Sequence, residues 1–238
     1  MGRCILLLDR VGNDAWRMPG TSGEGRALAA ASASGRPDHY RYDPRDVSTA
    51  GLEASIDPDS LVDQRMTYAL RGKQLIYHGV PFDQDTEISG FFRLSAWIAI
   101  DQSDTDFRVD IYEIRGDGSA IPLTSDVRRA RYRENAREPR PIRTKDPLRY
   151  EFEHFTFVSQ EVKKGSRLRL IIGPINSIYR EKNYNSGGAV EQESMADARS
   201  VTVTLYHDRE HPSTLYVPLG AAPTPGEPTA PSSAFSRP

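Results

Sequence analysis

The strongest constraint on the fold of this chain is an alternation of apolar and polar residues with a period of two. Phe107, Val109 and Ile111 alternate with charged residues, and the segments 167–170 and 201–205 repeat the pattern. Such alternation places one set of side chains on a buried face and the other in solvent, as in half-buried antiparallel strands. No long stretch has the spacing of an amphipathic helix.

Turn signals such as Asp117-Gly118 and Gly165 separate the strand-like runs. We expect strands near 73–80, 87–100, 106–115, 119–124, 127–133, 149–158, 166–173, 199–207 and 214–218. Many short strands with few helices predict an all-β protein, a jelly-roll β-sandwich.

Composition divides the chain into three parts. Residues 1–37 begin with a short apolar strand and continue into a Gly-, Ala- and Ser-rich stretch, which predicts a lead-in and a flexible connector. Residues 38–220 carry the aromatic and β-branched runs of the predicted sandwich. Residues 221–238 contain five prolines and almost no large apolar residue, so we expect a disordered tail.

Charge and cysteine content exclude several classes of protein. The net charge is −2, with 31 Lys and Arg against 33 Asp and Glu, which argues against a globally basic nucleic-acid binder. The single cysteine excludes an intramolecular disulfide framework. No segment approaches the roughly 18 apolar residues of a membrane span, and the apolar run 4–8 is too short for a signal peptide. We therefore expect a cytoplasmic protein without nucleic-acid or membrane partners.

Catalytic machinery is not visible in the residues. The G-x-S-x-G motif of serine hydrolases is missing from the sequence. His207 and His211 lie four apart, but a strand precedes them and Pro212 follows, so they do not share a helical face for zinc. We predict no catalytic residue, no metal site and no cofactor.

Two charged segments each allow two interpretations. Asp101, Asp104 and Asp106 could hold calcium, but we favour hydrogen bonds to backbone amides or ion pairs with arginines at a strand entry. Residues 128–145 hold eight basic residues against two acids, with Tyr132 among them. They could contact nucleic acid, but we favour a strand followed by a solvated loop.

A series of short motifs follows the order found in one protein family. The motifs are YDPRD at 42–46, DQR at 63–65, LIY at 75–77, PF at 81–82, EISG at 87–90, DTDF at 104–107, RARYR at 129–133, KGSRL at 164–168, NYNSG at 183–187, His207, HPS at 211–213, Leu215 and PL at 218–219. In this order they resemble the C-terminal, non-catalytic domain of X-Pro dipeptidyl-peptidases and of cocaine-esterase-like (CocE/NonD) acyl hydrolases. The resemblance covers about residues 38–220, and Trp16 and Pro19 match the lead-in to that domain.

The resemblance implies a jelly-roll fold of the galactose-binding-like type and an accessory role in a serine hydrolase. In the family the Ser-Asp-His triad lies on an α/β-hydrolase domain N-terminal to this one, so the resemblance implies that domain as a partner and carries no catalytic residue over. The sequence departs from the family at 47–51 (VSTAG), where Pro-Val-Pro-Thr and paired glycines are usual, and at 165–167, where Gly-Ser-Arg replaces Gly-His-Arg.

The loop after YDPRD is the candidate functional segment. In the resembled hydrolases this loop lies near the catalytic domain and helps to line its acyl pocket. Here residues 47–61 carry Val47, Leu52, Ile56 and Leu61 among small and acidic residues. These side chains either anchor the loop from beneath or face a substrate or partner.

A second hypothesis is a stand-alone carbohydrate- or ligand-binding module, because sandwich folds serve both purposes. Such a module predicts an exposed aromatic platform among Trp97, Tyr112 and Tyr184. An accessory domain predicts instead a broad apolar face suited to another domain.

Overall fold

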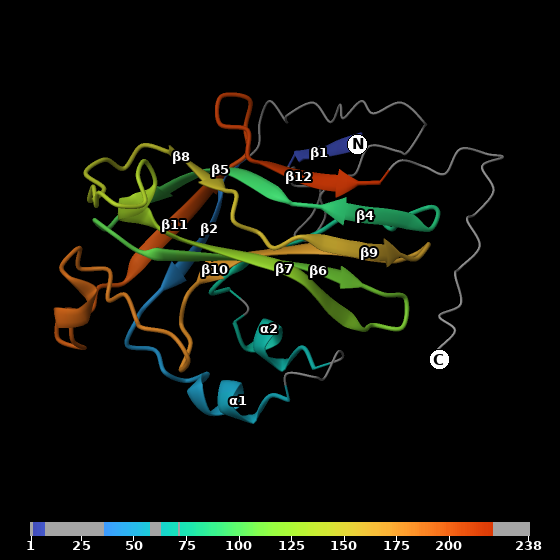
Figure 1. Cartoon of the computed structure of the whole chain (residues 1–238). Coiled ribbons are helices and arrows are strands. Elements are labelled where there is room, and N and C mark those ends of the chain that lie inside the picture. The colour runs from blue at the N-terminus through green and yellow to red at the C-terminus, as the bar shows by residue number, and fades with distance from the viewer. Residues whose placement is uncertain (1, 8–35, 58–62, 71, 221–238) are drawn as a thin grey trace, which may run out of the picture.

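Two antiparallel β-sheets face each other and enclose one hydrophobic core (Figure 1). The computed structural model describes residues 2–7, 36–57, 63–70 and 72–220. Among these residues no helix has the length and apolar character needed to span a membrane. Leu61, the predicted tail and the predicted connector up to residue 35 lie outside the described residues. The two sheets confirm the predicted all-β sandwich.

The larger sheet has eight strands. They are β1 (Gly2–Leu7), β2 (Asp38–Tyr42), β4 (Thr86–Gly90), β5 (Arg93–Ile100), β8 (Leu148–Phe152), β9 (Val158–Val162), β11 (Val201–Tyr206) and β12 (Thr214–Leu219). β5 pairs with β8 on one edge, and on the other edge with β11 and, further along, with β12. β4 pairs with β9 and meets β12 at one residue pair. β4 and β5 are therefore two halves of one bent strand.

The smaller sheet has four strands in the order β3–β10–β6–β7. Their bounds are Leu75–His78 for β3, Arg167–Pro174 for β10, Asp106–Ile114 for β6 and Ala120–Arg129 for β7. The turn between β6 and β7 contains Gly118 at φ 89°, a left-handed conformation that glycine adopts without strain. This confirms the turn predicted at Asp117-Gly118.

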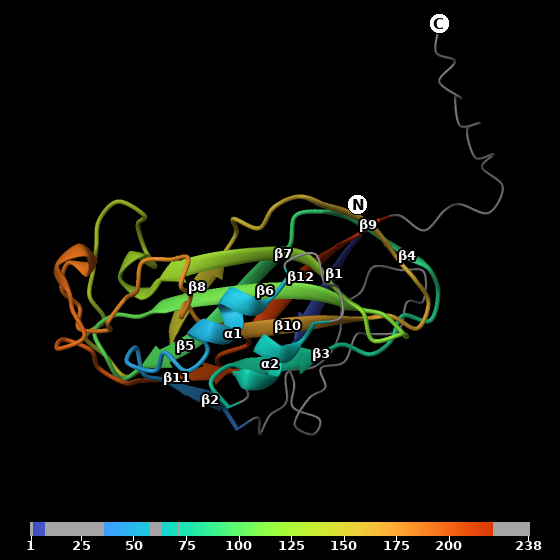
Figure 2. The same ribbon diagram turned by 90° about the horizontal axis from the view of Figure 1, so that it is seen from below.

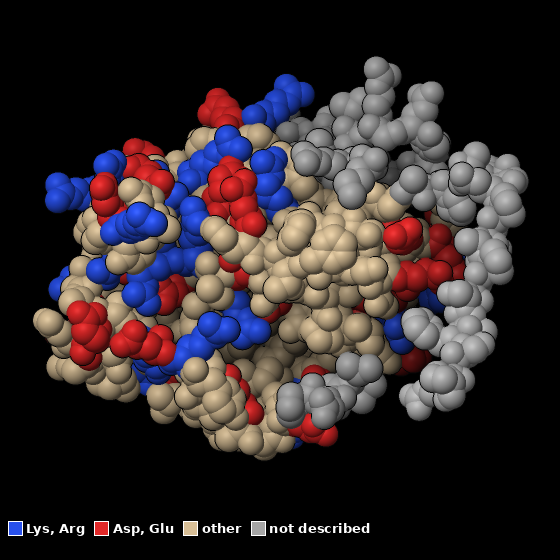
Figure 3. Space-filling view, viewed as in Figure 1, with Lys and Arg blue, Asp and Glu red and all other residues tan. Residues whose placement is uncertain are grey.

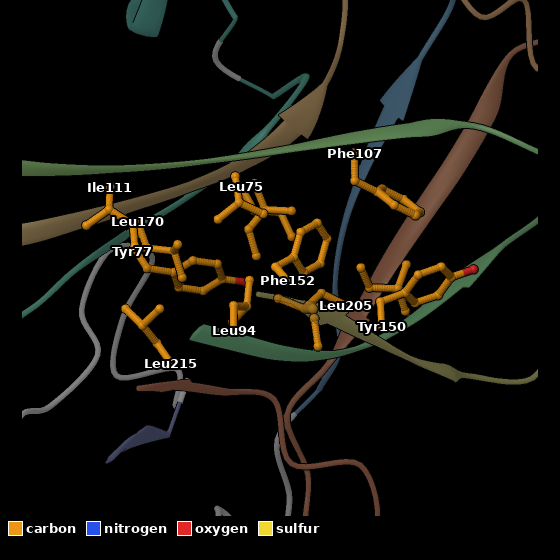
Figure 4. Packing of buried hydrophobic residues seen from close by; sticks show 14 of the residues in the cluster. Leu75, Tyr77, Leu94, Phe107, Ile111, Tyr150, Phe152, Leu170, Leu205 and Leu215 are labelled. Atoms are coloured by element: carbon orange, nitrogen blue, oxygen red, sulfur yellow. The ribbon is translucent and has the colours of Figure 1, made fainter. Parts of the chain in front are cut away.

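The core lies between the sheets and follows the predicted alternation. Phe107, Val109 and Ile111 of β6 are buried, whereas Arg108 and Asp110 face outward and are half-buried. β10 and β11 contribute alternate residues in the same way. Figure 4 shows the buried side chains of both sheets meeting in the space between the ribbons. Burial of this apolar surface is the main source of stability.

Several strand boundaries differ from the prediction. The expected strand 87–100 is interrupted at Phe91–Phe92, where two adjacent aromatic residues break the alternation. The expected strands 119–124 and 127–133 form one strand, β7, followed by a 3₁₀ turn at 130–132. β7 continues through Asp126, which pairs with Val109 of β6, and the Asp126 carboxylate accepts the backbone N–H groups of Val127 and His154. The expected strand 149–158 ends at Phe152, and the prediction missed β2 and β9.

Two short helices lie outside the smaller sheet. α1 (Ala50–Ser55) and α2 (Arg65–Ala69) lie beneath β10 in Figure 1 and in front of β6, β10 and β3 in Figure 2. α1 occupies the segment 47–61, which was predicted as a loop. Its sequence AGLEAS consists largely of residues with high helix propensity, but it is too short to show a helical period.

A buried polar network holds the loops at one end of the sandwich. The guanidinium of Arg131 donates to Asp104 (2.6 Å), and that of Arg129 donates to Asp106 (2.7 and 3.0 Å). The amide of Asn183 donates to both carboxylates at 2.9 Å. Burial raises the pKa of Asp104, and the bonds from Arg131 and Asn183 oppose that shift. The interpretation of these aspartates as partners of arginines is confirmed.

Neighbouring polar groups extend this structural role. Asp101 accepts the N–H of Thr202 at 2.7 Å. The described residues contain no cluster of three or more His, Cys, Asp or Glu side chains suited to a metal ion.

In the basic segment 128–145, β7 ends at Arg129 and the exposed Arg140 pairs with Glu134 at 2.7 Å. This is the strand followed by a solvated loop that we favoured.

We predict that the Asp104 network is a major determinant of stability. Arg131→Met should lower the free energy of unfolding by about 3–5 kcal/mol, because it leaves a buried carboxylate without its cation. Asn183→Ala should lower it by about 1–3 kcal/mol through unmade hydrogen bonds. Urea unfolding measures both, and Arg45→Met, which breaks an exposed ion pair, is the control. Equal losses for Arg131→Met and Arg45→Met would contradict the prediction.

Candidate interaction surface around helix α1

The chain leaves β2 through a turn fixed by Asp43. The N–H of Asp46 donates to the carbonyl of Asp43 at 3.0 Å. The Asp43 carboxylate accepts the backbone N–H and the guanidinium of Arg45, and also the hydroxyl of Ser200 at 2.9 Å. The bonds from Arg45 hold the pKa of Asp43 well below its ordinary value. The turn therefore directs the chain into α1 in a defined geometry.

The side chain of Glu53 joins α1 to a segment more than 120 residues away. Its carboxylate accepts the hydroxyl of Ser177 at 2.7 Å and the N–H of Ile178 at 2.8 Å. The first turn of the helix is closed by the N–H of Glu53, which donates to the carbonyl of Thr49 at 2.9 Å. A six-residue helix is unstable in isolation, so these tertiary contacts determine its position.

Three further contacts tie the turn before α1 to the body of the domain. Lys73 donates to the carboxylate of Asp46, and the Asn176 amide donates to the Asp46 carbonyl at 2.9 Å. The Lys182 ammonium donates to the carbonyl of Pro44 at 2.7 Å, and burial lowers the pKa of Lys182. The bond from Lys73, together with bonds from Ser48, lowers the pKa of Asp46 from 3.8 to about 2.

Gln64 connects the start of α2 to the smaller sheet. Its amide nitrogen donates to the carbonyl of Gly118 at 3.0 Å, and its amide oxygen accepts a bond from Arg169 at 2.6 Å. Arg169 also donates to the Nε2 atom of His78 at 2.7 Å. Polar contacts thus attach the start of α2 to the smaller sheet. Neither α1 nor α2 contains a fully buried residue.

A charged strip lies on the outer face of β6, close to these helices. Arg108 pairs with Asp110 at 2.8 Å, and burial raises the pKa of Asp110. Burial also raises the pKa of Tyr112 to about 12. A hollow of about 340 Å³ beside the strip has Val127, Ile175, Tyr132, Arg180 and Glu181 among its lining residues. The outer face is therefore mixed in polarity.

Exposed apolar side chains gather around α1. Val47 is 57% exposed, Tyr68 70%, Ile178 48% and Tyr179 74%. Val47 lies in the turn before α1, Ile178 and Tyr179 follow the contact with Glu53, and Tyr68 belongs to α2. We call these four residues the α1 surface. Ile178 is bonded to Glu53 of α1, and α2 contacts α1, so these exposed groups come from segments that lie beside each other.

The structure brings part of the predicted site to this surface. Val47 is exposed, as required of a residue that contacts a partner, whereas Leu52 and Ile56 are half-buried. The prediction missed Tyr68, Ile178 and Tyr179. Residues 178 and 179 are distant in sequence, and only the bonds between Glu53 and the 177–178 backbone region bring them close to α1. No short-range pattern could have identified them.

The aromatic platform of a carbohydrate module does not form from the three predicted residues. Trp97, Tyr112 and Tyr184 are all half-buried. Trp97 belongs to β5 and packs against His211 with ring centroids 5.1 Å apart, whereas Tyr112 belongs to the other sheet. The two histidines also have different partners. The Nε2 atom of His207 lies 3.3 Å from Asp38, and the Nδ1 atom of His211 lies 3.3 Å from Asp208.

Comparison with known proteins gives one matching family. The family of X-Pro dipeptidyl-peptidase C-terminal non-catalytic domains matches residues 12–216. Cocaine esterase from Rhodococcus sp. (strain MB1 Bresler) is 25% identical over 202 residues, which are 84% of this chain and 35% of the esterase. This chain thus spans about a third of the length of that relative.

Two solved structures share the fold. An aminopeptidase from the marine sediment archaeon Thaumarchaeota archaeon superposes with a TM-score of 0.71 at 20% identity, covering 91% of this chain and 36% of the aminopeptidase. An α-amino acid ester hydrolase gives a TM-score of 0.72 at 18% identity, covering 90% of this chain and 36% of the hydrolase. At these identities the likeness shows the fold alone.

The Lys73–Asp46 pair predicts a pH dependence. Because the pKa of Asp46 is lowered from 3.8 to about 2 in the folded chain, the pair should stabilise the fold fully above pH 3.8 and lose this effect as the pH falls through 2. Carboxyl NMR titration should give a higher Asp46 pKa in Lys73→Met. The exposed Lys145→Met is the control. An unchanged Asp46 pKa in Lys73→Met would refute this assignment.

Proposed function

This chain belongs to the family of X-Pro dipeptidyl-peptidase C-terminal non-catalytic domains, and on that premise we propose that its α1 surface docks against an α/β-hydrolase catalytic domain. The catalytic domain would be part of the same polypeptide or a separate chain. The observation that carries the proposal is the gathering of exposed apolar side chains around an anchored helix. The catalytic domain would perform acyl transfer through a serine ester, on X-Pro peptides or small esters.

The α1 surface has the composition of a domain interface. It contains the exposed Val47, Ile178 and Tyr179, and Arg45 and Arg180 are their near neighbours in the sequence. An apolar centre with a polar rim is typical of protein–protein interfaces, and tyrosine is enriched in them. Individual rim charges contribute little affinity, so the exposed apolar residues should dominate the energy of docking.

The contacts that anchor α1 favour a role in positioning its residues against the catalytic domain. Glu53, Asp46 and Lys182 hold the helix and its turn without any partner present. A surface that is ordered before binding loses less conformational entropy when the partner docks. The half-buried Leu52 and Ile56 would then be presented at fixed positions near the acyl pocket of the catalytic domain. The reaction itself would remain with the residues of that domain.

We expect the purified chain alone to hydrolyse neither X-Pro anilides nor small aryl esters. The G-x-S-x-G motif is missing from its sequence, and nucleophilic attack by serine needs a histidine–carboxylate pair beside it. Absorbance assays and labelling with a fluorophosphonate probe measure this. A turnover rate well above that of buffer, abolished by one Ser→Ala change, would show that the chain has a catalytic triad. That result would contradict this expectation.

If the α1 surface docks to the hydrolase, substitutions in it should weaken binding without lowering the stability of the fold. Replacing Val47, Ile178 and Tyr179 together with Ser should change the free energy of unfolding by only about 0.5 kcal/mol per site, because all three side chains are exposed. The same variant should bind at least tenfold more weakly to the α/β-hydrolase polypeptide that the genome encodes beside or in frame with this chain, as measured by calorimetry.

The matched control removes exposed aromatic residues from another face. Phe91→Ser with Phe157→Ser deletes comparably exposed apolar groups of the larger sheet and should leave the affinity unchanged. The docking proposal is wrong if both variants weaken binding equally or if neither does. It is also wrong if no hydrolase reading frame accompanies this chain.

A further inference from the structure

A second hollow, lined mainly by apolar residues, lies on the larger sheet and is separate from the α1 surface. It encloses about 350 Å³ and is lined by residues 89–93, 216–219, Glu153 and Phe157. Phe91 is 63% exposed and Phe157 56%, and their rings meet edge to face with centroids 5.4 Å apart. Figure 3 shows an uncharged area in the middle of the face that carries β4 and β9. The accessory role described above leaves this hollow unexplained.

The bend between β4 and β5 produces the hollow. Adjacent residues of an extended chain point to opposite faces, so the burial of Phe92 in the core turns Phe91 outward. Gly90 permits the close approach of β12 here, because a Cβ atom at this position would lie 2.9 Å from the Cβ atom of Pro218. Packing therefore explains Phe92, whereas Phe91 and Phe157 remain uncovered.

Arg93 supplies one cation to the hollow. Its guanidinium carbon lies 4.0 Å from the ring centroid of Tyr216, and a guanidinium nitrogen lies 3.6 Å from Glu153. The arginine keeps 38% of its side chain exposed. The hollow thus combines aromatic walls with a cation that is still accessible. Aromatic walls of this kind bind proline-rich peptides in the polyproline II conformation.

The chain continues beyond the hollow into a proline-rich sequence. β12 ends at Leu219, and the N–H of Gly220 donates to the carbonyl of Glu87 at 2.8 Å. This bond fixes the position of Gly220, the last described residue, directly after Pro218 and Leu219 of the hollow. Beyond it, the sequence 225–231 reads PGEPTAP, with prolines three residues apart. Three residues make one turn of polyproline II, so in that conformation these prolines would share one face.

We propose that the hollow binds the chain's own segment 223–231 in the polyproline II conformation. The proline rings contact Phe91 and Phe157, and the carboxylate of Glu227 pairs with Arg93. The five residue steps from Gly220 to Pro225 span up to about 17 Å, which suffices to bring the first proline of the repeat to the hollow. A tether of this length gives an effective concentration on the order of millimolar, which favours this segment over a free partner.

The test uses the full chain and a variant confined to the tail. In ¹⁵N-labelled protein, changing Pro225, Pro228 and Pro231 to Ser should shift the amide resonances of Phe91, Arg93 and Phe157. The amide of Tyr179, on the α1 surface, should not move. All three changes leave the sequence of the described residues within 36–220 intact. Unchanged resonances around the hollow would overturn the proposal.

A reciprocal variant and a dilution series complete the test. Phe91→Ser with Phe157→Ser should lower the ¹⁵N heteronuclear NOE of Glu227 to the value of an unfolded chain, whereas Tyr179→Ser should leave it unchanged. The shifts should persist on dilution, because the contact is intramolecular. Shifts that vanish on dilution would assign the hollow to a second copy and overturn the proposal.

Discussion

Two buried carboxylates determine how one end of this domain is built. Asp104 and Asp106 lie where the chain enters β6, and buried charges are tolerated only when they are paired. Their cations come from Arg129 and Arg131 at the end of β7, and their common amide donor is Asn183. Three connections that are far apart in sequence must therefore meet at this end. Hydrophobic burial stabilises the two sheets, but the network fixes how these connections join them.

The α1 surface depends on this arrangement. Lys182, the residue before Asn183, donates a hydrogen bond to the carbonyl of Pro44. The same segment supplies Ser177 and Ile178 to Glu53 of α1. The network thus places residues 175–183 so that they hold the turn after β2 and the short helix that follows. Without these contacts a helix of six residues would not be stable.

The sequence predicts the parts of the structure that depend on local periodicity. The alternation in 106–111 and 201–205 identified β6 and β11 and the face that each strand buries. It failed at Phe91–Phe92, where a bend rather than a turn signal interrupts the strand, and at β2, whose pairing with β11 follows from topology. At the candidate site it selected Val47 but not Tyr179, because the contact through Glu53 spans more than 120 residues. Long-range polar contacts leave no periodic trace in a sequence.

The central claim is that this domain meets a hydrolase through the face that carries α1. Hydrogen–deuterium exchange of the chain, with and without the accompanying α/β-hydrolase polypeptide, tests this claim most directly. The account predicts slower exchange in residues 46–56, 65–69 and 176–181 when the hydrolase is bound. Protection confined to residues 89–93 and 153–157, on the larger sheet, would contradict it.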